Sequence, residues 1–157
     1  MVMANTYTQI YIHVVFAVQG RHHLLPKKHL EELYKYITGI VQRREQKLLA
    51  VGGMPDHVHV FFGLNPRIAL SDLVRDVKAG SSGFINDRGW VPGQFRWQEG
   101  YGAFSYARSQ VDQVCRYILN QEKHHTRRSF KEEYLEMLRI FEVEHDERYL
   151  FDWVEAV

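Results

Sequence analysis

Long apolar runs and cysteine pairs are the features most clearly missing from this 157-residue sequence. No apolar stretch approaches the roughly 18 residues that a transmembrane helix needs. The N-terminus lacks the charged region and following apolar stretch of a signal peptide. Cys115 is the single cysteine, so no intrachain disulfide can form. These absences argue against a helical membrane protein and a disulfide-stabilised secreted domain, and we expect a cytoplasmic protein without a membrane partner.

Internal repeats, linkers and low-complexity tracts are also absent. With 45% hydrophobic and 13% aromatic residues, the composition is that of a folded globular protein. The length suits one domain with a sizeable core. We therefore expect a single domain over residues 1–157, in which residues 129–157 form an acidic C-terminal helix and tail.

The net charge of +1 conceals an uneven distribution of charge along the chain. Residues 129–157 carry three basic and nine acidic side chains, and residues 1–128 hold the remaining 17 basic and 10 acidic ones. A basic body is compatible with an anionic partner such as nucleic acid. The alternative is an ordinary solvated surface with an acidic C-terminal helix.

Hydrophobic periodicity predicts the order strand, helix, two strands, helix, strand, helix, helix. The predicted strands are residues 6–18, 48–51, 57–64 and 101–107, and the predicted helices are 26–47, 68–84, 109–124 and a last one from 129. Capping boxes at Ser109/Asp112 and Ser129/Glu132 start the last two helices. This order predicts an α+β, ferredoxin-like split βαβ fold, with a mainly antiparallel sheet, helices on one face and extra C-terminal helices.

Aromatic side chains are concentrated in two segments outside these elements. In the loop over residues 87–99, Trp90, Phe95 and Trp97 are interleaved with Arg96, and such a mixture can stack on unpaired bases. The alternative is that these aromatics close the core beneath the loop. The tail over residues 144–157 is expected to dock on the domain through four apolar side chains, Tyr149, Leu150, Phe151 and Trp153.

Two histidines occupy one face of the predicted strand that follows Pro55 and Asp56. His57 and His59 are two residues apart, so their imidazoles project to the same side of a strand. Val58, Val60 and Phe62 project to the other side, which we expect to pack against the helices. The histidine face is then expected to point toward solvent or a partner. Two imidazoles on a rigid strand can supply two ligands of a divalent metal, although such a triplet alone is a weak motif.

A second group of polar side chains lies on the helix predicted from Ser109. Tyr117 and Gln121 are four residues apart and share a face, with His124 further along it. A tyrosine hydroxyl is a poor nucleophile at neutral pH unless a metal or a nearby base assists it. Gln121 offers an oxygen ligand one turn away. Two imidazoles and one amide oxygen suit Mg²⁺ or Mn²⁺ at a phosphoryl site, and Zn²⁺ less well.

In combination, these residues resemble the single-tyrosine HUH transposases, most closely the insertion-sequence-200-like group. The resemblance rests on Pro55-Asp56-His57-Val58-His59, followed about sixty residues later by Tyr117-Ile118-Leu119-Asn120-Gln121 and His124-His125. The strand containing residues 11–16, the segment 101–105 and the helix over 130–138 are also similar to that family. The resemblance covers nearly the whole chain.

The resemblance implies a ferredoxin-like homodimer acting on single-stranded DNA with subterminal hairpins. It implies that His57, His59 and Gln121 bind a divalent metal, Mg²⁺ or Mn²⁺. Tyr117 would attack a DNA phosphate at the element's end, forming a 5′-phosphotyrosine and releasing a 3′-hydroxyl, and strand joining would reverse this step. The helix carrying Tyr117 completes the active site of the other subunit in many members, and the sequence leaves open which arrangement applies here.

Five basic residues are candidate phosphate contacts, each also compatible with a solvated surface: Arg67, Arg75, Lys78, Arg96 and Arg108. Two other functions remain open at this point. One is a domesticated relative that binds hairpin-forming genomic repeats without moving. The other is a metal-dependent hydrolase that uses the same histidines with water as nucleophile, which would leave Tyr117 and Gln121 unexplained.

Overall fold

A computed structural model describes residues 5–154 of the chain. Its strands are β1 (Tyr11–Ala17), β2 (Lys47–Met54), β3 (His57–Gly63) and β4 (Gly102–Tyr106). Its helices are α1 (Leu30–Arg43), α2 (Leu70–Arg88), α3 (Val111–Leu119), α4 (Gln121–His124) and α5 (Phe130–Ile140). Short 3₁₀ turns occupy Arg21–His23, Lys27–His29, Arg108–Gln110 and Glu147–Tyr149. No helix in this part of the chain is long and apolar enough to span a membrane.

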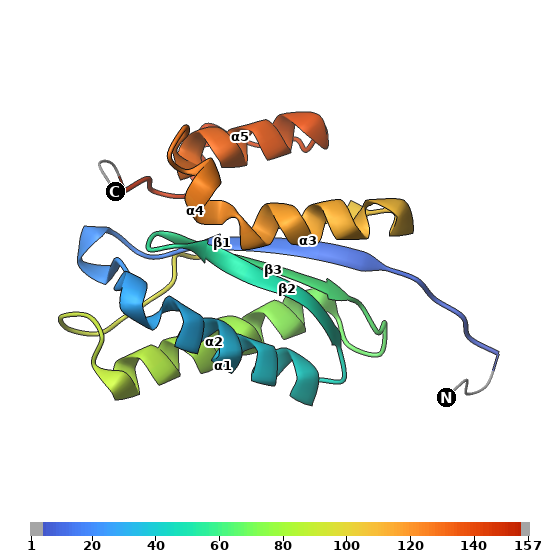
Figure 1. Cartoon of the computed structure of the whole chain (residues 1–157), viewed down its shortest axis with the longest axis horizontal. Helices are drawn as coiled ribbons and strands as arrows, with labels where there is room; N and C mark the ends of the chain where they lie inside the picture. Colours follow the sequence, from blue (N-terminus) through green and yellow to red (C-terminus); the bar gives the residue numbers. More distant parts are fainter. Residues whose placement is uncertain (1–4, 155–157) are drawn as a thin grey trace.

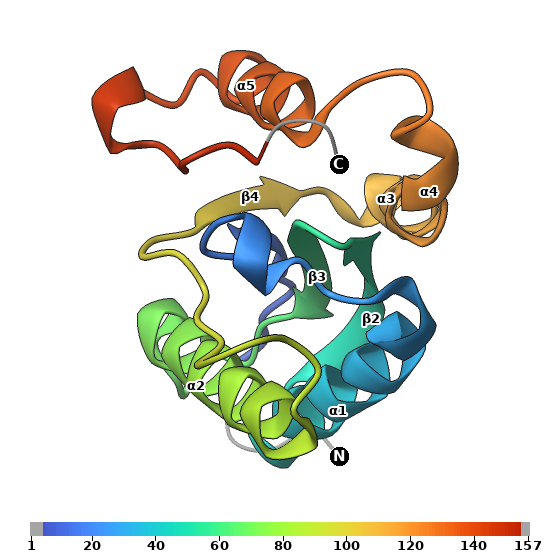
Figure 2. The ribbon, with the colours of Figure 1, turned by 90° about the vertical axis from the view of Figure 1, so that its left-hand side faces the viewer.

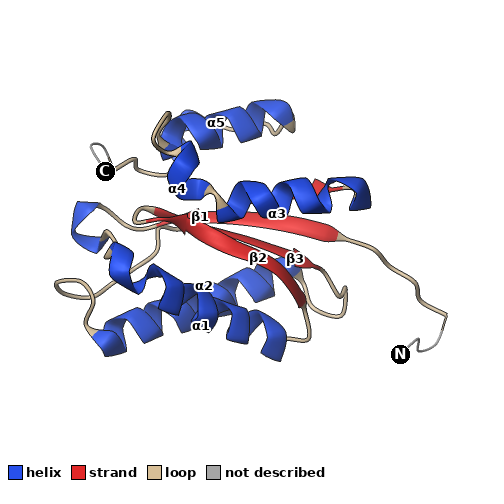
Figure 3. Ribbon diagram, viewed as in Figure 1, coloured by secondary structure: helices blue, strands red, loops and turns tan. Residues whose placement is uncertain are grey.

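The four strands form one antiparallel sheet in the order β2-β3-β1-β4. The two helical crossovers, α1 after β1 and α2 after β3, give the split βαβ arrangement that the sequence predicts. Figure 1 and Figure 3 show α1 and α2 together beneath the sheet and the extra C-terminal helices above it. Figure 2 shows the same three layers from the side. The predicted fold class is therefore confirmed.

The alternation of side chains along β3 divides the core between the two faces of the sheet. Val58, Val60 and Phe62 pack in the large cluster beneath α1 and α2, as predicted. The opposite face is also apolar: Phe61 packs against α3, and Val15 of β1 packs against α5. Both faces of the sheet are therefore buried, which explains the nearly continuous apolar run of β3.

The expectation that the histidine face points to solvent or a partner is wrong for this chain. His57 and His59 are 0% exposed, because α3, α4 and α5 of the same chain cover them. The histidine face is covered because this side of the sheet also carries apolar residues. The buried stripe of α3 packs against them through Val111, Val114 and Ile118.

The helix predicted over residues 109–124 is interrupted. A 3₁₀ turn precedes α3, and Asn120 separates α3 from α4. Ser109 makes no capping hydrogen bond to Asp112; instead the side chain of Gln110 accepts one from the backbone N–H of Ala107, at 2.9 Å. The second capping box is confirmed, since Ser129 Oγ accepts from the N–H of Glu132 at 3.2 Å.

The aromatic loop and the tail both close parts of the core. Phe95 and Trp97 are 1% and 8% exposed and pack beside Phe16, so the core-closing alternative holds for them. Phe151 and Trp153 pack against the start of α5, as the docking prediction requires. Tyr149 is an exception, being 81% exposed. Residues 155–157, at the end of the predicted tail, lie outside the described residues.

Candidate active site

Buried polar side chains from β3, α4 and α5 meet where the C-terminal helices cover the sheet. Their centre is Glu133, which is 0% exposed. Its Oε1 atom lies 3.4 Å from Nε2 of His57 and 3.1 Å from Nε2 of His59. Its Oε2 atom accepts a hydrogen bond from Nε2 of Gln121 at 3.0 Å and another from the hydroxyl of Tyr117.

The structure thus brings together all four residues that the sequence proposed for the metal and the nucleophile. Gln121, 2% exposed, also accepts a hydrogen bond from Nε2 of His57 through its Oε1 atom, at 2.9 Å. The break at Asn120 does not separate Tyr117 from Gln121, because both side chains reach the same carboxylate. The ring of Tyr117 lies edge-on to that of His59, with centroids 6.0 Å apart.

His125 joins the same group from the end of α4. Its Nε2 atom lies 3.0 Å from Oε1 of Gln121 and 3.3 Å from Oε1 of Glu133. With His57 and Glu133 it forms a candidate metal-binding triad, whose ligand atoms all lie within 4.8 Å of one another. We call the five residues His57, His59, Gln121, His125 and Glu133 the histidine–glutamate cluster.

The donor set and spacing of the histidine–glutamate cluster fit a divalent cation. Imidazole nitrogens, an amide oxygen and a carboxylate oxygen are all ligands of Mn²⁺, and the oxygens suit Mg²⁺. Two donor atoms bound at right angles, each about 2.1 Å from an ion, lie about 3 Å apart. The direct contacts between donor atoms of the cluster measure 2.9–3.4 Å, and the ligand atoms of the triad all lie within 4.8 Å of one another. The same residues can therefore turn their donor atoms toward one ion with little movement.

Hydrogen bonds behind the cluster orient the two histidines differently. Nδ1 of His57 lies 2.7 Å from Oδ1 of Asp56, a carboxylate partner typical of a metal-binding imidazole. Nδ1 of His59 lies 2.7 Å from Nε2 of His13 on β1, which is itself 0% exposed. His13, which the sequence motifs do not single out, therefore contacts a predicted metal ligand.

Burial and neighbouring charges shift the titration of these groups in opposite directions. Burial alone would lower the pKa of His57, but its hydrogen bonds to Asp56 and Glu133 outweigh this and raise the pKa to about 9. Burial lowers the pKa of His59. Burial would raise the pKa of Glu133, yet the surrounding imidazoles hold it well below its usual range. An ionised Glu133 can therefore persist inside the protein.

Tyr117 experiences two opposing influences. Burial, and then the Glu133 carboxylate, raise the pKa of its hydroxyl above the ordinary value, while the positive charge of Arg128 lowers it. Arg128 follows α4 and also pairs with Glu136 of α5. The tyrosine hydroxyl thus lies between an anionic and a cationic side chain. This neutral phenol needs assistance before it can attack a phosphate.

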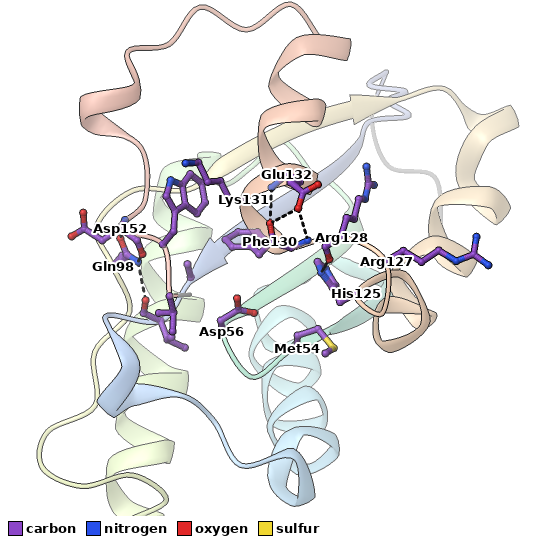
Figure 4. Close-up of a pocket in the computed structure, with 15 residues that line it drawn as sticks. Met54, Asp56, Gln98, His125, Arg127, Arg128, Phe130, Lys131, Glu132 and Asp152 are labelled. Carbon is purple, nitrogen blue, oxygen red and sulfur yellow. Dashed lines mark hydrogen bonds between the residues drawn. The ribbon is translucent and has the colours of Figure 1, made fainter. Parts of the chain in front are cut away.

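A cavity of about 490 Å³ opens beside the cluster. Asp56 and His125 lie on its wall, together with Gln98 and Phe130 (Figure 4). Trp153 lines it as well. Arg127, Arg128 and Lys131 also line it. The cavity is large enough for a nucleotide-sized group, and one of its basic residues, Arg128, interacts electrostatically with Tyr117.

The basic residues predicted to contact phosphate lie away from the cluster. Arg75 and Lys78 are on α2, which covers the other face of the sheet. Together with Arg96 they line a surface depression, where Lys78 donates hydrogen bonds to the carbonyls of Gln98 and Gly100. Arg67 is exposed in the turn that follows β3, and Arg108 is exposed in the 3₁₀ turn that follows β4. None of these five residues therefore joins the candidate active site.

The sequence did not predict three residues of this site. They are Asp56, which is the hydrogen-bond partner of His57, and the two further candidate ligands His125 and Glu133. The signal for Glu133 was present: it is an acidic residue within the buried stripe of α5, beside Phe130, Tyr134 and Met137. A charged residue at a core position requires a partner. His125 is the second residue of the pair His124-His125. Its direction depends on the break in the helix at Asn120, which the sequence does not reveal.

Comparison with known proteins identifies the family of the chain. The family model described as "Transposase IS200 like" matches residues 6–121. The chain is 23% identical over 120 residues to the ISDra2 transposase TnpA of Deinococcus radiodurans, covering 72% of this chain and 84% of that protein.

Two solved structures share the fold. One is a crystal structure of a proposed transposase from Deinococcus radiodurans R1, with 24% identity, a TM-score of 0.58, and coverage of 77% of this chain and 98% of the other. The second is a REP-associated tyrosine transposase bound to a REP hairpin, with 17% identity, a TM-score of 0.53, and coverage of 75% and 70%. Since the family model spans most of the sequence, the chain belongs to the family of IS200-like transposases.

Proposed function

We propose that this transposase cleaves and rejoins single-stranded DNA at element ends through a covalent bond to Tyr117. The observation that carries the proposal is the contact of the Tyr117 hydroxyl with Glu133, whose other oxygen lies 3.1 Å from His59. This contact supports the proposal because it brings the Tyr117 hydroxyl beside the candidate metal ligands of the same chain. We assign His57, His59 and Gln121 as ligands of Mg²⁺ or Mn²⁺, with His125 and Glu133 as further donors in the same cluster.

The reaction is balanced without a nucleotide cofactor. A bond forms between the Tyr117 oxygen and the phosphorus, and the bond between phosphorus and the 3′-oxygen breaks. The phenolic proton is lost from Tyr117, and the departing 3′-oxygen gains a proton, giving a 5′-phosphotyrosine and a 3′-hydroxyl. A bound divalent cation would polarise the phosphate and stabilise the charge that develops on it. Because the phosphotyrosine keeps a phosphodiester, attack by a 3′-hydroxyl can rejoin strands.

The substrate and assembly are part of the same proposal. Hairpin binding is supported by the structural relative that holds a REP hairpin. Arg67, Arg75, Lys78, Arg96 and Arg108 remain proposed phosphate contacts. The homodimer that the family resemblance implies is also proposed; Leu119 and Ile140, 66% and 58% exposed, offer apolar surface on the side of the C-terminal helices. Sedimentation or light scattering of the purified chain measures the oligomeric state.

The test is incubation of the protein with a labelled single-stranded element end and Mg²⁺ or Mn²⁺. A covalent adduct should appear on a denaturing gel with the wild-type protein. Tyr117→Phe should form none while still binding the hairpin, and His57→Ala should lose metal-dependent cleavage. Undiminished cleavage by Tyr117→Phe would overturn the assignment, and turnover without an adduct would favour the hydrolase alternative.

A second candidate is a resident gene product that binds hairpin-forming repeats. The structural relative with a REP hairpin favours it, whereas the complete set of Tyr117, His57, His59 and Gln121 favours catalysis. Hairpin binding by a wild-type protein that forms no adduct on any element end with either metal would select this alternative.

A further inference from the structure

We propose that His13 is a positioning residue whose hydrogen bond to His59 reverses when His59 binds the divalent cation, so that His13 then accepts from the Nδ1–H of His59 and leaves Nε2 of His59 free for the ion. The inference rests on the proposed metal site and goes beyond it to a residue outside the ligand set. His13 lies on β1, next to β3 in the sheet, and faces the same side as His59. Its Nε2 atom is 2.7 Å from Nδ1 of His59, and the two rings stack with centroids 4.9 Å apart.

The hydrogen bond to His59 is the only one that the His13 side chain makes within the described residues. His13 is 0% exposed, and its Nδ1 atom has no hydrogen-bond partner among residues 5–154. The rings of Phe61, Phe104 and Tyr106 surround it, with centroids 6.1–6.4 Å away. An imidazole in such a place is best accommodated neutral, with one N–H and one lone pair.

One arrangement of protons satisfies the contacts that the structure shows. Nε2–H of His13 donates to Nδ1 of His59, and Nε2–H of His59 donates to Oε1 of Glu133, 3.1 Å away. In this arrangement the Nδ1 atom of His13 carries only an unused lone pair. It also leaves His59 without a free nitrogen for a cation, because both of its nitrogens are engaged.

Binding a cation through Nε2 of His59 requires the opposite arrangement. The proton of His59 must then sit on Nδ1, and Nδ1–H must find an acceptor. Nε2 of His13 is the atom in place to accept it, so the hydrogen bond between the two histidines reverses its direction. The proton of His13 moves to Nδ1, among the aromatic rings. His57 differs, because Asp56 accepts from its Nδ1–H in every state.

The first test follows the histidine nitrogens by long-range ¹H–¹⁵N correlation NMR, with and without Mg²⁺. We expect His59 to change from the Nε2–H to the Nδ1–H form on Mg²⁺ addition, and His13 to change from Nε2–H to Nδ1–H. An unchanged His13 tautomer in a protein that binds Mg²⁺ through His59 would overturn the proposal. This measurement uses the wild-type chain, so it does not depend on a variant folding.

The second test compares Mn²⁺ affinity by calorimetry in two variants of His13. His13→Phe removes the acceptor and should weaken Mn²⁺ binding by about 10- to 100-fold. His13→Gln places an amide oxygen near the position of Nε2 and should restore affinity to within a few-fold of wild type. His29→Phe is the matched control, since His29 stacks on Trp90 beside α1 and should leave affinity unchanged.

The outcomes separate this inference from the proposed function. A wild-type protein that binds neither Mg²⁺ nor Mn²⁺ would contradict the proposed metal site itself. A wild-type protein that binds Mn²⁺, with His13→Phe equal to it, would contradict only the role of His13. Circular dichroism should first show that both His13 variants are folded. Equal losses of Mn²⁺ affinity in His13→Phe and His13→Gln would then show that ring packing matters and the hydrogen-bond acceptor does not, which would also overturn the inference.

Discussion

The hydroxyl of Tyr117 donates a hydrogen bond to Glu133 of the same chain. Tyr117 lies on α3 and Glu133 on α5, and the two helices cover the same face of the sheet. The other oxygen of Glu133 is near His57 and His59. One carboxylate thus links the proposed nucleophile to the proposed metal ligands within a single chain.

This link predicts an active site assembled from one chain. A mixture of Tyr117→Phe and His57→Ala proteins should therefore remain unable to form adducts, because neither chain holds both the nucleophile and the ligand. If helices were exchanged between subunits, a mixed dimer would restore one complete site. Adduct formation on the labelled element end measures this, and substantial activity of the mixture would contradict the prediction. Co-purification of differently tagged chains is the control for mixing.

Glu133→Gln should weaken divalent-metal binding and slow adduct formation. The substitution keeps the size of the side chain but removes the negative charge on which the imidazoles and Tyr117 converge. We expect Mn²⁺ affinity to fall by at least about tenfold, as for loss of one ligand or its close partner. Calorimetry measures the affinity, and a single-turnover assay measures the adduct.

Glu31→Gln is the matched control for Glu133→Gln. Glu31 is on α1, where its side chain is 85% exposed beside Lys35, so an exposed pair of this kind contributes little. Both measurements should match wild type. Unchanged Mn²⁺ affinity in a folded Glu133→Gln protein would remove Glu133 from the metal site.

The sheet and its two crossover helices were predictable because local pattern and global position agree there. The alternation of Val58, Val60 and Phe62 identified one core face, and the packing beneath α1 and α2 confirms it. The cover over the other face was not predicted, since the same strand pattern is compatible with an open face. The break at Asn120 was also missed, because no proline or glycine marks it and the periodicity of Tyr117 and Gln121 continues across it.

Only part of the candidate site could be predicted from the sequence, because spacing within one element is visible there and packing between elements is not. His57, His59, Tyr117 and Gln121 share faces of regular elements, so their spacing indicates that they can meet. Glu133 lies on a different helix, and its distance from His59 depends on how α5 packs over the sheet. Periodicity within one element carries no such information. The partnership of His13 with His59 likewise depends on the register between β1 and β3.

Gly52→Ala should destabilise the protein and displace the helix that carries Tyr117. A Cβ atom at Gly52 of β2 would overlap the backbone carbonyl of Ile118, the residue after Tyr117. Because that neighbour is backbone, α3 must shift, and overpacking of this kind costs about 1–3 kcal/mol. Urea unfolding should show the loss, and adduct formation should fall as well.

Gly83→Ala provides the contrasting substitution. Gly83 lies within α2, and a Cβ there would meet no atom within 4 Å. Replacing a helix-interior glycine with alanine should leave activity unchanged and raise stability by up to about 1 kcal/mol. A Gly52→Ala protein as stable and active as Gly83→Ala would show that the approach of α3 to β2 is unimportant for the site.

Arg128→Ala should slow the attack by Tyr117 more than it weakens DNA binding. The positive charge of Arg128 lowers the pKa of the Tyr117 hydroxyl, against the burial and the Glu133 carboxylate that raise it. Without that charge the developing tyrosinate is less stable, and a loss of about 1.4 kcal/mol corresponds to a tenfold slower reaction.

Arg127→Ala is the matched control, because Arg127 is exposed and its side chain points in a different direction (Figure 4). Single-turnover adduct formation and hairpin binding should be measured on both variants. An equal, small loss of DNA affinity in both, with no difference in rate, would indicate that Arg128 acts only as one more phosphate contact.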